Sequence, residues 1–390
     1  MMSQPVYLDG MATTSVDERV VETMIPYLHQ ISGNPSSRSH AYGWEAESAV
    51  KLARQTVADA INAEPRCLIW TSGGTESNNL AIKGVAESCL QKGRHIVTVK
   101  TEHSAVLEPC RYLESLGFEV TYLDVNADGL IHLNSLENTL RPDTILVSVM
   151  AANNETGILQ PTHQIGAICR DRKILFHVDA AQAVGKIPID VKAAKIDLLT
   201  ATAHKIYGPK GSGVLFFRKG AVRLAPQLHG GAQEGGVRSG TLPTHQIVGF
   251  AKALELAVNA QVEESKRLLT LRERLWNRLQ SLADINLNGH PTQRLPHCLS
   301  VSFGGVDSAA LMLGVRSTIA VSSGSACASG SQAPSHVLTA MGREAQLAKA
   351  TLRFGLGRFN TETDIELAAQ TVLEVVTSLR EHETPAAGFS

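Results

Sequence analysis

The chain has 390 residues, which is too long for one small domain and long enough to bury a large core. Hydrophobic residues make up 43% of it and charged residues 19%, as is typical of a globular protein rather than a disordered one. With 36 basic and 37 acidic side chains the formal net charge is −1, so bulk charge provides no attraction to nucleic acid or to an anionic membrane.

No apolar run reaches the roughly 18 residues that a membrane-spanning helix needs. The first residues also lack a basic segment followed by an apolar stretch, so we expect a cytoplasmic protein with neither a secretory signal nor a membrane partner. The cysteines and histidines are dispersed, with no paired spacing typical of a zinc site, and we expect no metal centre.

Seven short runs rich in Val, Ile and Leu alternate with helical patterns in the first 220 residues. They cover residues 67–71, 95–99, 119–123, 144–150, 175–178, 198–201 and 213–217. Such runs are typical of strands buried on both faces of a mostly parallel sheet, with helices between them. Because ligands of open α/β sheets bind beyond the carboxyl ends of the strands, the turns after these runs are where we expect a site.

A helical pattern without Pro or Gly follows at about 250–284, and a smaller α/β segment comes after it. The pattern predicts a helix that connects two domains. The alternative is a coiled-coil partner surface, which is less favoured because the apolar repeat is not a sustained heptad.

Three groups of polar residues follow the expected strands. Gly74 and Thr75 lie in a Gly-Gly turn before a helical pattern, where free N–H groups favour an anion such as phosphate, although Thr75 as an ordinary helix cap is the alternative. Asp179 ends an apolar run; it is either a capping residue or a buried carboxylate paired with a protonated heterocyclic nitrogen. Lys205 is either a solvated lysine or a Schiff-base amine.

In this order, a phosphate turn, an acidic residue and a lysine indicate a site for pyridoxal 5'-phosphate (PLP). The chain resembles the cysteine desulfurases of the NifS/IscS type, which have the class V aminotransferase fold. The resemblance rests on segments spread over nearly the whole chain: YLD at 7–9, ATT at 12–14, GNPSSRSH at 33–40, TEH at 101–103, NNETG at 153–157, HVDAAQ at 177–182, HKIYGPKG at 204–211, RSGT at 238–241, SSGSAC at 322–327 and LRF at 352–354.

The resemblance implies PLP-dependent transferase fold type I, with a mixed, mostly parallel sheet in a large domain and a smaller α/β domain. We expect the large domain at residues 15–257 and the small domain at 1–14 and 258–390, the latter carrying a catalytic loop at about 321–334.

The resemblance also implies roles for individual residues around the cofactor ring. Lys205 forms the Schiff base with PLP, Asp179 pairs with the pyridine nitrogen, and Gln182 hydrogen-bonds the phenolic oxygen. His103 stacks on the ring and moves protons. Asn154 contacts the cofactor as well.

Further residues are expected to hold the phosphate and the substrate. The phosphate is held by the backbone of Gly74 and by Thr75, Thr202 and His204. Thr241 is similar to a residue that reaches the phosphate of a neighbouring subunit, which implies a homodimer. The substrate carboxylate is held by Asn34, Asn154 and Arg353; a guanidinium suits that bidentate geometry.

Cys327 lies among small residues, where we expect an exposed loop and a reactive thiol. In the family this position attacks the sulfur of bound L-cysteine and carries the persulfide, while alanine leaves. The other cysteines lie in or beside apolar patterns, and we expect them to be structural because free Cys behaves as a small buried hydrophobe. They are Cys67, Cys89, Cys110, Cys169 and Cys298.

The function implied is therefore that of a cysteine desulfurase, which supplies sulfur to an iron–sulfur scaffold or another acceptor protein, or for thiolated tRNA and thio-cofactors. The alternatives are selenocysteine lyase and another reaction of class V aminotransferase type. A non-catalytic scaffold on the same fold is disfavoured by the intact set of Lys205, Asp179, His103 and Cys327.

The chain departs from the family pattern at three glycines. Gly10 follows Asp9 where a larger residue is frequent, Gly235 stands where Arg is common, and Gly355 replaces a frequent Ser. We expect Gly235 to loosen a loop near the subunit contact. The segment after the last helical pattern is short, and in relatives a longer tail there helps to dock the iron–sulfur scaffold.

Overall fold

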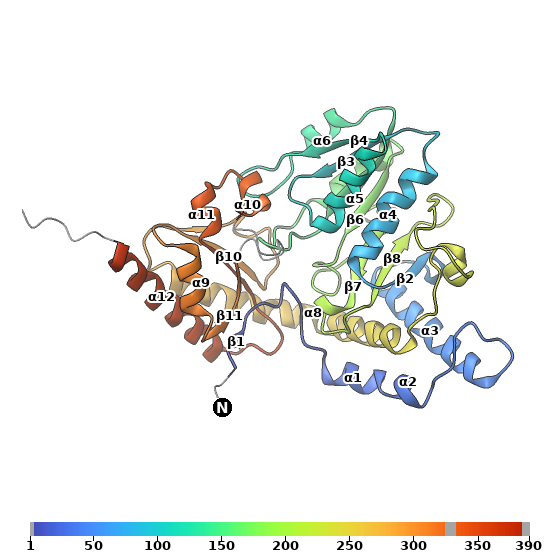
Figure 1. The fold of residues 1–390 in the computed structure, drawn as a ribbon, viewed down its shortest axis with the longest axis horizontal. Helices are drawn as coiled ribbons and strands as arrows, with labels where there is room; N and C mark the ends of the chain where they lie inside the picture. The colour runs from blue at the N-terminus through green and yellow to red at the C-terminus, as the bar shows by residue number, and fades with distance from the viewer. Residues whose placement is uncertain (1–3, 324–332, 384–390) are drawn as a thin grey trace, which may run out of the picture.

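The computed structural model describes residues 4–323 and 333–383, so the candidate nucleophile Cys327 lies outside the described residues. A seven-stranded sheet dominates the structure, and a smaller four-stranded sheet stands beside it (Figure 1). In spatial order the large sheet contains β2 (Leu68–Thr71), β8 (Gly213–Phe217), β7 (Leu198–Thr202), β6 (Leu175–Asp179), β5 (Thr144–Met150), β3 (His95–Val99) and β4 (Glu119–Leu123).

The expected mixed, mostly parallel sheet is confirmed. Only β8 runs antiparallel to its two neighbours, and the other six strands share one direction. All seven expected strands are present, with ends within one residue of those predicted. Burial on both faces was wrong for β4, because Glu119 is exposed and the next three residues are only partly buried.

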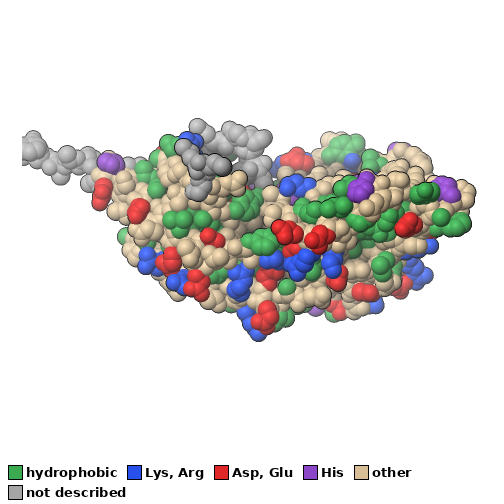
Figure 2. Space-filling model, turned by 90° about the horizontal axis from the view of Figure 1, so that it is seen from below, with side chains coloured by type: hydrophobic (Ala, Val, Ile, Leu, Met, Phe, Trp, Pro, Cys, Tyr) green, Lys and Arg blue, Asp and Glu red, His purple; other side chains and the backbone are tan. Residues whose placement is uncertain are grey.

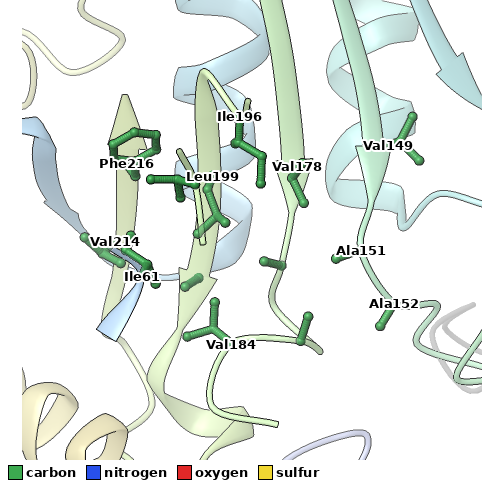
Figure 3. Packing of buried hydrophobic residues seen from close by; sticks show 14 of the residues in the cluster. Ile61, Val149, Ala151, Ala152, Val178, Val184, Ile196, Leu199, Val214 and Phe216 are labelled. Atoms are coloured by element: carbon green, nitrogen blue, oxygen red, sulfur yellow. The ribbon is translucent and has the colours of Figure 1, made fainter. Parts of the chain in front are cut away.

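Helices cover both faces of the large sheet. Alternate strand residues face opposite layers, as the two-residue period of a strand requires. Trp70 joins the cluster under α3 (Ala41–Ala60) and α8 (Thr244–Leu279), and Ile69 joins the cluster under α4 (Gly74–Ser88) and α5 (Ser104–Ser115). Figure 3 shows residues of the first cluster from neighbouring strands, among them Val149, Val178 and Phe216. The helices of this part are α1 (Glu18–Met24), α2 (Pro26–His29), α3 (Ala41–Ala60), α4 (Gly74–Ser88), α5 (Ser104–Ser115), α6 (Leu133–Thr139) and α7 (Thr162–Asp171), with short 3-10 turns η1 (Pro65–Cys67), η2 (Ala203–Lys205) and η3 (Gln233–Gly236).

Helix α8 (Thr244–Leu279) joins the two sheets, as expected of a connecting helix. Its first half packs in the cluster of the large sheet and its second half in that of the small sheet. The predicted limits of this helix were wrong at both ends. The helix begins directly after Pro243, earlier than predicted, and it ends at Leu279. It does not extend to Asp284, whose φ of 47° is left-handed and therefore incompatible with an α-helix.

The small sheet is antiparallel, and a separate hydrophobic cluster lies beneath it. Its order is β12 (Ser322–Ser323), β13 (Thr351–Gly355), β10 (Cys298–Phe303) and β9 (Ile285–Leu287). The N-terminal β1 (Val6–Tyr7) pairs in parallel with β11 (Ile319–Ala320). The remaining helices are α9 (Ser308–Val315), α10 (His336–Ala340), α11 (Ala345–Lys349) and α12 (Glu362–Glu383). The residue limits of the two expected domains stay a prediction.

On the face shown in Figure 2, acidic and basic side chains are intermingled, in keeping with the net charge of −1. Among residues 4–323 and 333–383, no helix is long and apolar enough to cross a membrane. In the same part of the chain, no three His, Cys, Asp or Glu side chains form a group that could hold a metal ion.

Candidate active site

A cavity of about 310 Å³ lies at the carboxyl end of the large sheet. Five of the six parallel strands send residues into it from the turns that follow them: β2, β3, β5, β6 and β7. The lining contains nine of the residues singled out in the sequence: Gly74, Thr75, His103, Asn154, Asp179, Gln182, Thr202, His204 and Lys205, together with Arg353 from β13 of the small sheet. The carboxyl-end rule for α/β sheets thus located the cavity correctly.

Part of the cavity lining is suited to binding an anion. Helix α4 begins at Gly74, and its N-cap Gly73 provides no side chain to cap the first N–H groups. The positive end of the helix dipole therefore faces the cavity beside the Thr75 hydroxyl. Burial, together with the charges of Lys205 and Lys210, lowers the pKa of His204 to about 4, so His204 is neutral at pH 7.

Asp179 is fixed by two donors at the end of β6. The Asn78 amide donates to Oδ2 at 2.7 Å, and the backbone N–H of Ala181 donates to Oδ1 at 2.9 Å. Asp179 is 6% exposed and Asn78 only 1%. A buried carboxylate held so firmly is suited to face a cationic ring nitrogen.

Lys205 lies in η2, directly after β7. Its Nζ donates to the carbonyl oxygens of Met11 and Ala12 at 2.7 and 2.6 Å. The Gln182 amide nitrogen donates to the same Met11 carbonyl at 2.9 Å, while its Oε1 is buried without a partner. The segment at Met11 and Ala12 therefore holds the amine in the cavity.

His103 is the N-cap of α5, and its Nδ1 accepts the Ala105 N–H at 3.0 Å. Burial lowers its pKa; Asp179 acts in the opposite direction, and Lys205 and His336 lower it further. At neutral pH the imidazole is therefore uncharged, and because Nδ1 accepts, the proton is on Nε2. This leaves an N–H group available for proton transfer within the cavity.

Arg353 of β13 contributes a guanidinium to the lining of the cavity. The Arg353 side chain is 3% exposed. Its Nη1 donates to the Asn154 carbonyl at 2.8 Å, and its Nη2 donates to Asp9 at 2.8 Å and to Ser322 at 3.0 Å. Its Nε and the side-chain oxygen of Asn154 are buried without a hydrogen-bond partner. Unpartnered buried polar atoms are costly unless a ligand completes them.

Two predicted site residues lie outside this cavity. Asn34 is exposed in the loop between α2 and α3, where its Oδ1 accepts the Ser36 N–H at 2.9 Å. Thr241 is also exposed, which is compatible with its expected reach into a neighbouring subunit. Their roles stay predictions, as does the role of Cys327.

The turn that contains Gly235 is more firmly held than the sequence suggested. Gly235 has a φ of 66°, a left-handed conformation that favours glycine. The neighbouring Glu234 side chain, 3% exposed, accepts from Arg54 at 2.5 Å and from the Trp70 N–H at 2.8 Å. The expected loosening is therefore opposed by a buried ion pair directly beside the glycine.

All five described cysteines are free, and four of them are buried. Burial raises the pKa of Cys110 and of Cys169 to about 12, and it also raises the pKa of Cys89 and of Cys298. These groups stay protonated at neutral pH and are poor nucleophiles. This agrees with the structural role expected for them.

The sequence did not identify Asn78 or the segment from Asp9 to Thr13 as parts of the site. Asn78 is one helical turn after Thr75, so the face of α4 that carries the phosphate turn also carries it; that spacing was the available signal. The N-terminal motifs at 7–9 and 12–14 contributed to the resemblance to the family, but no role in the site was predicted for their residues. Met11 and Ala12 line the cavity, and Thr13 hydrogen-bonds His204 at 3.1 Å.

Comparison with known proteins decides the family. Residues 6–367 match the family described as aminotransferase class-V. The chain belongs to this family. Two curated relatives, both named cysteine desulfurase IscS, are similar over nearly their whole length. The relative from Dechloromonas aromatica is 52% identical over 382 residues, covering 97% of this chain and 94% of the relative. The one from Neisseria meningitidis is 53% identical over 378 residues, covering 97% and 93%.

Solved structures agree with this assignment to class V. A NifS-like protein has a TM-score of 0.90 at 38% identity, covering 96% of this chain and 100% of its own. A NifS-like protein from Rickettsia africae has a TM-score of 0.85 at 32% identity, with coverages of 96% and 100%. A structure described as SspA in complex with cysteine has a TM-score of 0.81 at 37% identity, with coverages of 91% and 100%. The expected fold type I is confirmed.

Class V aminotransferases and cysteine desulfurases depend on PLP. The cavity fits this cofactor by the chemistry of its donors. The lining contains an uncapped helix start, a fixed carboxylate and a lysine amine, together with buried side-chain atoms of Gln182, Asn154 and Arg353 that have no hydrogen-bond partner.

Proposed function

We propose that this chain is a PLP-dependent cysteine desulfurase that converts L-cysteine to L-alanine and transfers the sulfur to Cys327. The observation that carries the proposal is the presence, in one cavity, of an amine, Lys205, and a buried guanidinium, Arg353, with unpartnered polar atoms beside it. An α-amino acid has the complementary groups. Relatives of this chain named cysteine desulfurase, covering 97% of it, support cysteine as that amino acid.

In this proposal the α4 N-terminus, Thr75, Thr202 and His204 hold the phosphate, and Asp179 and Gln182 hold the ring. When bound, PLP supplies a carbonyl carbon for amines and a ring that stabilises negative charge at the substrate Cα. In the structure the Gln182 amide nitrogen donates to the Met11 carbonyl. To donate to the phenolic oxygen of PLP, this nitrogen has to turn toward the ring.

Arg353 and Asn154 bind the substrate carboxylate and set the orientation of the amino acid. Lys205, released from the Met11 and Ala12 carbonyls, removes the proton from Cα. Neutral His103, with its proton on Nε2, moves a proton near the reacting sulfur.

The residues on both sides of the segment that contains Cys327 are attached to the cavity. Before it, Ser322 donates to Asp9 at 2.8 Å. After it, Ser335 donates to Glu155, and the His336 Nε2 lies 2.9 Å from the Glu102 carbonyl, next to His103. The described residues that flank this segment therefore lie close to residues that line the cavity: Ser322 accepts from Arg353, and Glu155 and Glu102 adjoin Asn154 and His103. This proximity supports Cys327 as the nucleophile.

The reaction balances without an external oxidant. The Cβ–S bond of L-cysteine breaks and a sulfur–sulfur bond forms on Cys327. The two thiols together provide two hydrogens, one of which ends in the new methyl group and the other on the persulfide. The products are L-alanine and Cys327 persulfide, which passes its sulfur to an acceptor protein, such as an iron–sulfur scaffold, or into thiolated tRNA and thio-cofactors.

A homodimer completes the proposal, because Thr241 is expected to reach the phosphate site of a second subunit. Several large hydrophobic side chains on and near α1–α3 are exposed in the single chain and are available for burial against a second copy: Ile25, Leu28, Tyr42, Trp44 and Leu52. The cytoplasmic location stays a prediction from the sequence.

The experiment is to treat the purified, PLP-loaded protein with L-cysteine, without reductant, and to map the added sulfur by mass spectrometry of its peptides. We expect one extra sulfur on the Cys327 peptide and none on the peptides of the five buried or partly buried cysteines. A parallel assay with L-selenocysteine tests selenocysteine lyase: faster alanine formation from that substrate would favour the alternative. Extra sulfur on another cysteine, or on none, would overturn the assignment.

A further inference from the structure

Asp9 is the ion-pair partner of Arg353 in the described structure. Its Oδ1 accepts from Arg353 Nη2 at 2.8 Å and from Ser322 Oγ at 2.8 Å, and Arg353 Nη2 also donates to Ser322 at 3.0 Å. The Arg353 and Asp9 side chains are 3% and 21% exposed. A buried guanidinium needs a nearby negative charge and acceptors for its N–H groups. Asp9 provides the charge and an acceptor for Nη2.

Asp9 does not occupy every donor of the guanidinium. Nη1 is engaged by the Asn154 carbonyl, while Nε has no partner. Because two of the three nitrogens are fixed by protein oxygens, the plane of the guanidinium is fixed as well. A carboxylate that enters the cavity therefore meets a pre-oriented donor rather than a flexible side chain.

Two glycines place Asp9 against β13. The backbone N–H of Gly10 donates to the Gly355 carbonyl at 2.8 Å. A Cβ at Gly10 would lie 2.9 Å from that same oxygen, and a Cβ at Gly355 would lie 2.5 Å from the Met11 nitrogen. These are two of the three positions at which the chain departs from the family pattern, and the structure brings them into contact.

The same segment holds the reactive amine. Met11 and Ala12, directly after Gly10, accept from Lys205 through their carbonyl oxygens. A shift of the segment away from β13 would therefore alter the guanidinium and the amine together.

We propose that Asp9 is a positioning residue that orients Arg353 for the substrate carboxylate, and that the contact between Gly10 and Gly355 holds Asp9 in place. The inference rests on the proposed function, since it deepens the account of how the amino acid is bound. It assigns specificity for an α-carboxylate to a residue that does not itself touch the substrate.

The test compares two amines that differ in one charge, L-alanine and L-alaninamide. Their dissociation constants are measured by calorimetry on the PLP-loaded protein and its variants. Asp9→Ala removes the oxygen that Arg353 binds, and we expect it to weaken L-alanine binding about tenfold. Asp9→Asn keeps an acceptor oxygen and should stay within about threefold of the wild type. Neither change should alter L-alaninamide binding.

The glycine contact is tested in the same assay. Gly355→Ala should weaken L-alanine binding as Asp9→Ala does, and the double variant should be no weaker than Asp9→Ala alone, because both act through one contact. Asp124→Asn is the matched control: its side chain is 75% exposed and pairs with Lys100, so removing this charge should change neither dissociation constant.

The inference is overturned if Asp9→Ala leaves L-alanine binding unchanged, or weakens L-alanine and L-alaninamide equally, as a general structural defect would. Additive losses in the double variant would overturn the role of the glycine contact. If the wild type binds neither amine, the inference falls as well. Failure of the proposed function gives a different result: a wild type that binds L-alanine but forms none from L-cysteine.

Discussion

Asn78 provides the sharpest test of the buried polar network beneath the cavity. Its amide donates to Asp179 Oδ2 at 2.7 Å, and both residues are nearly inaccessible to solvent. Asn78→Ala removes a hydrogen bond to a charged group, which should cost about 1.5–3 kcal/mol of the free energy of unfolding. Asn78→Asp has almost the same shape but places a second carboxylate against the first.

The cost of Asn78→Asp follows from the distance. Two unit charges 2.7 Å apart repel by about 6 kcal/mol at an effective dielectric constant of about 20. Protonating one aspartate of ordinary pKa about 3.9 at pH 7 costs only about 4 kcal/mol. The folded variant therefore takes up a proton, and about 4 kcal/mol is the expected destabilisation at pH 7.

This destabilisation depends on pH in a definite direction. The shared proton raises one folded-state carboxyl pKa above its unfolded value, so the folded state binds more protons and gains stability as the pH falls. The deficit of Asn78→Asp relative to the wild type should shrink by about 1.4 kcal/mol per pH unit between about pH 8 and pH 5. The assay is urea unfolding of the cofactor-free proteins, in which the deficit of Asn78→Ala should stay constant. A deficit of Asn78→Asp that does not change with pH would refute the reasoning.

Three further predictions follow from the same structure. His103→Gln removes the neutral imidazole and should lower kcat for alanine formation at least about 100-fold, while the visible absorbance of bound PLP persists. Burial raises the pKa of the Glu155 carboxyl in the folded state, so the wild type loses stability as the pH rises through that pKa, whereas a variant with a neutral amide does not. The melting temperature of Glu155→Gln minus that of the wild type should therefore increase from about pH 5 to pH 8. Phe250 is fully buried with its ring 5.9 Å from that of Trp70, and Phe250→Ala should lower the free energy of unfolding in urea by about 3–5 kcal/mol. An unchanged kcat of His103→Gln would contradict the first prediction, and a melting-temperature difference that does not vary with pH would contradict the second. A loss below about 1 kcal/mol in the free energy of unfolding of Phe250→Ala would contradict the third.

The strands and the location of the cavity were predictable because both depend on local sequence. Short β-branched runs bounded by polar turns predict buried strands, and the carboxyl-end rule then places Asp179 and Lys205 together. The position of β4 at the sheet edge was not predictable, because strand order is set by pairing between distant segments.

The contacts of Asp9 and Asn78 were beyond sequence reasoning for a related reason. Asp9 meets Arg353 across 344 positions of the chain, and Asn78 meets Asp179 across 101. No local pattern reports such a pair. The departures at Gly10 and Gly355 were visible individually, but only the fold shows that they touch.

The central claim is that the chain removes sulfur from L-cysteine. Its most direct measurement is the amount of alanine and sulfide formed when the PLP-loaded protein is incubated with L-cysteine and a thiol reductant, with Lys205→Ala and Cys327→Ser in parallel. The account predicts equimolar alanine and sulfide from the wild type and neither product from the two variants. A folded, PLP-loaded wild type that forms no alanine, or a Cys327→Ser protein that forms it at the undiminished rate, would contradict the account.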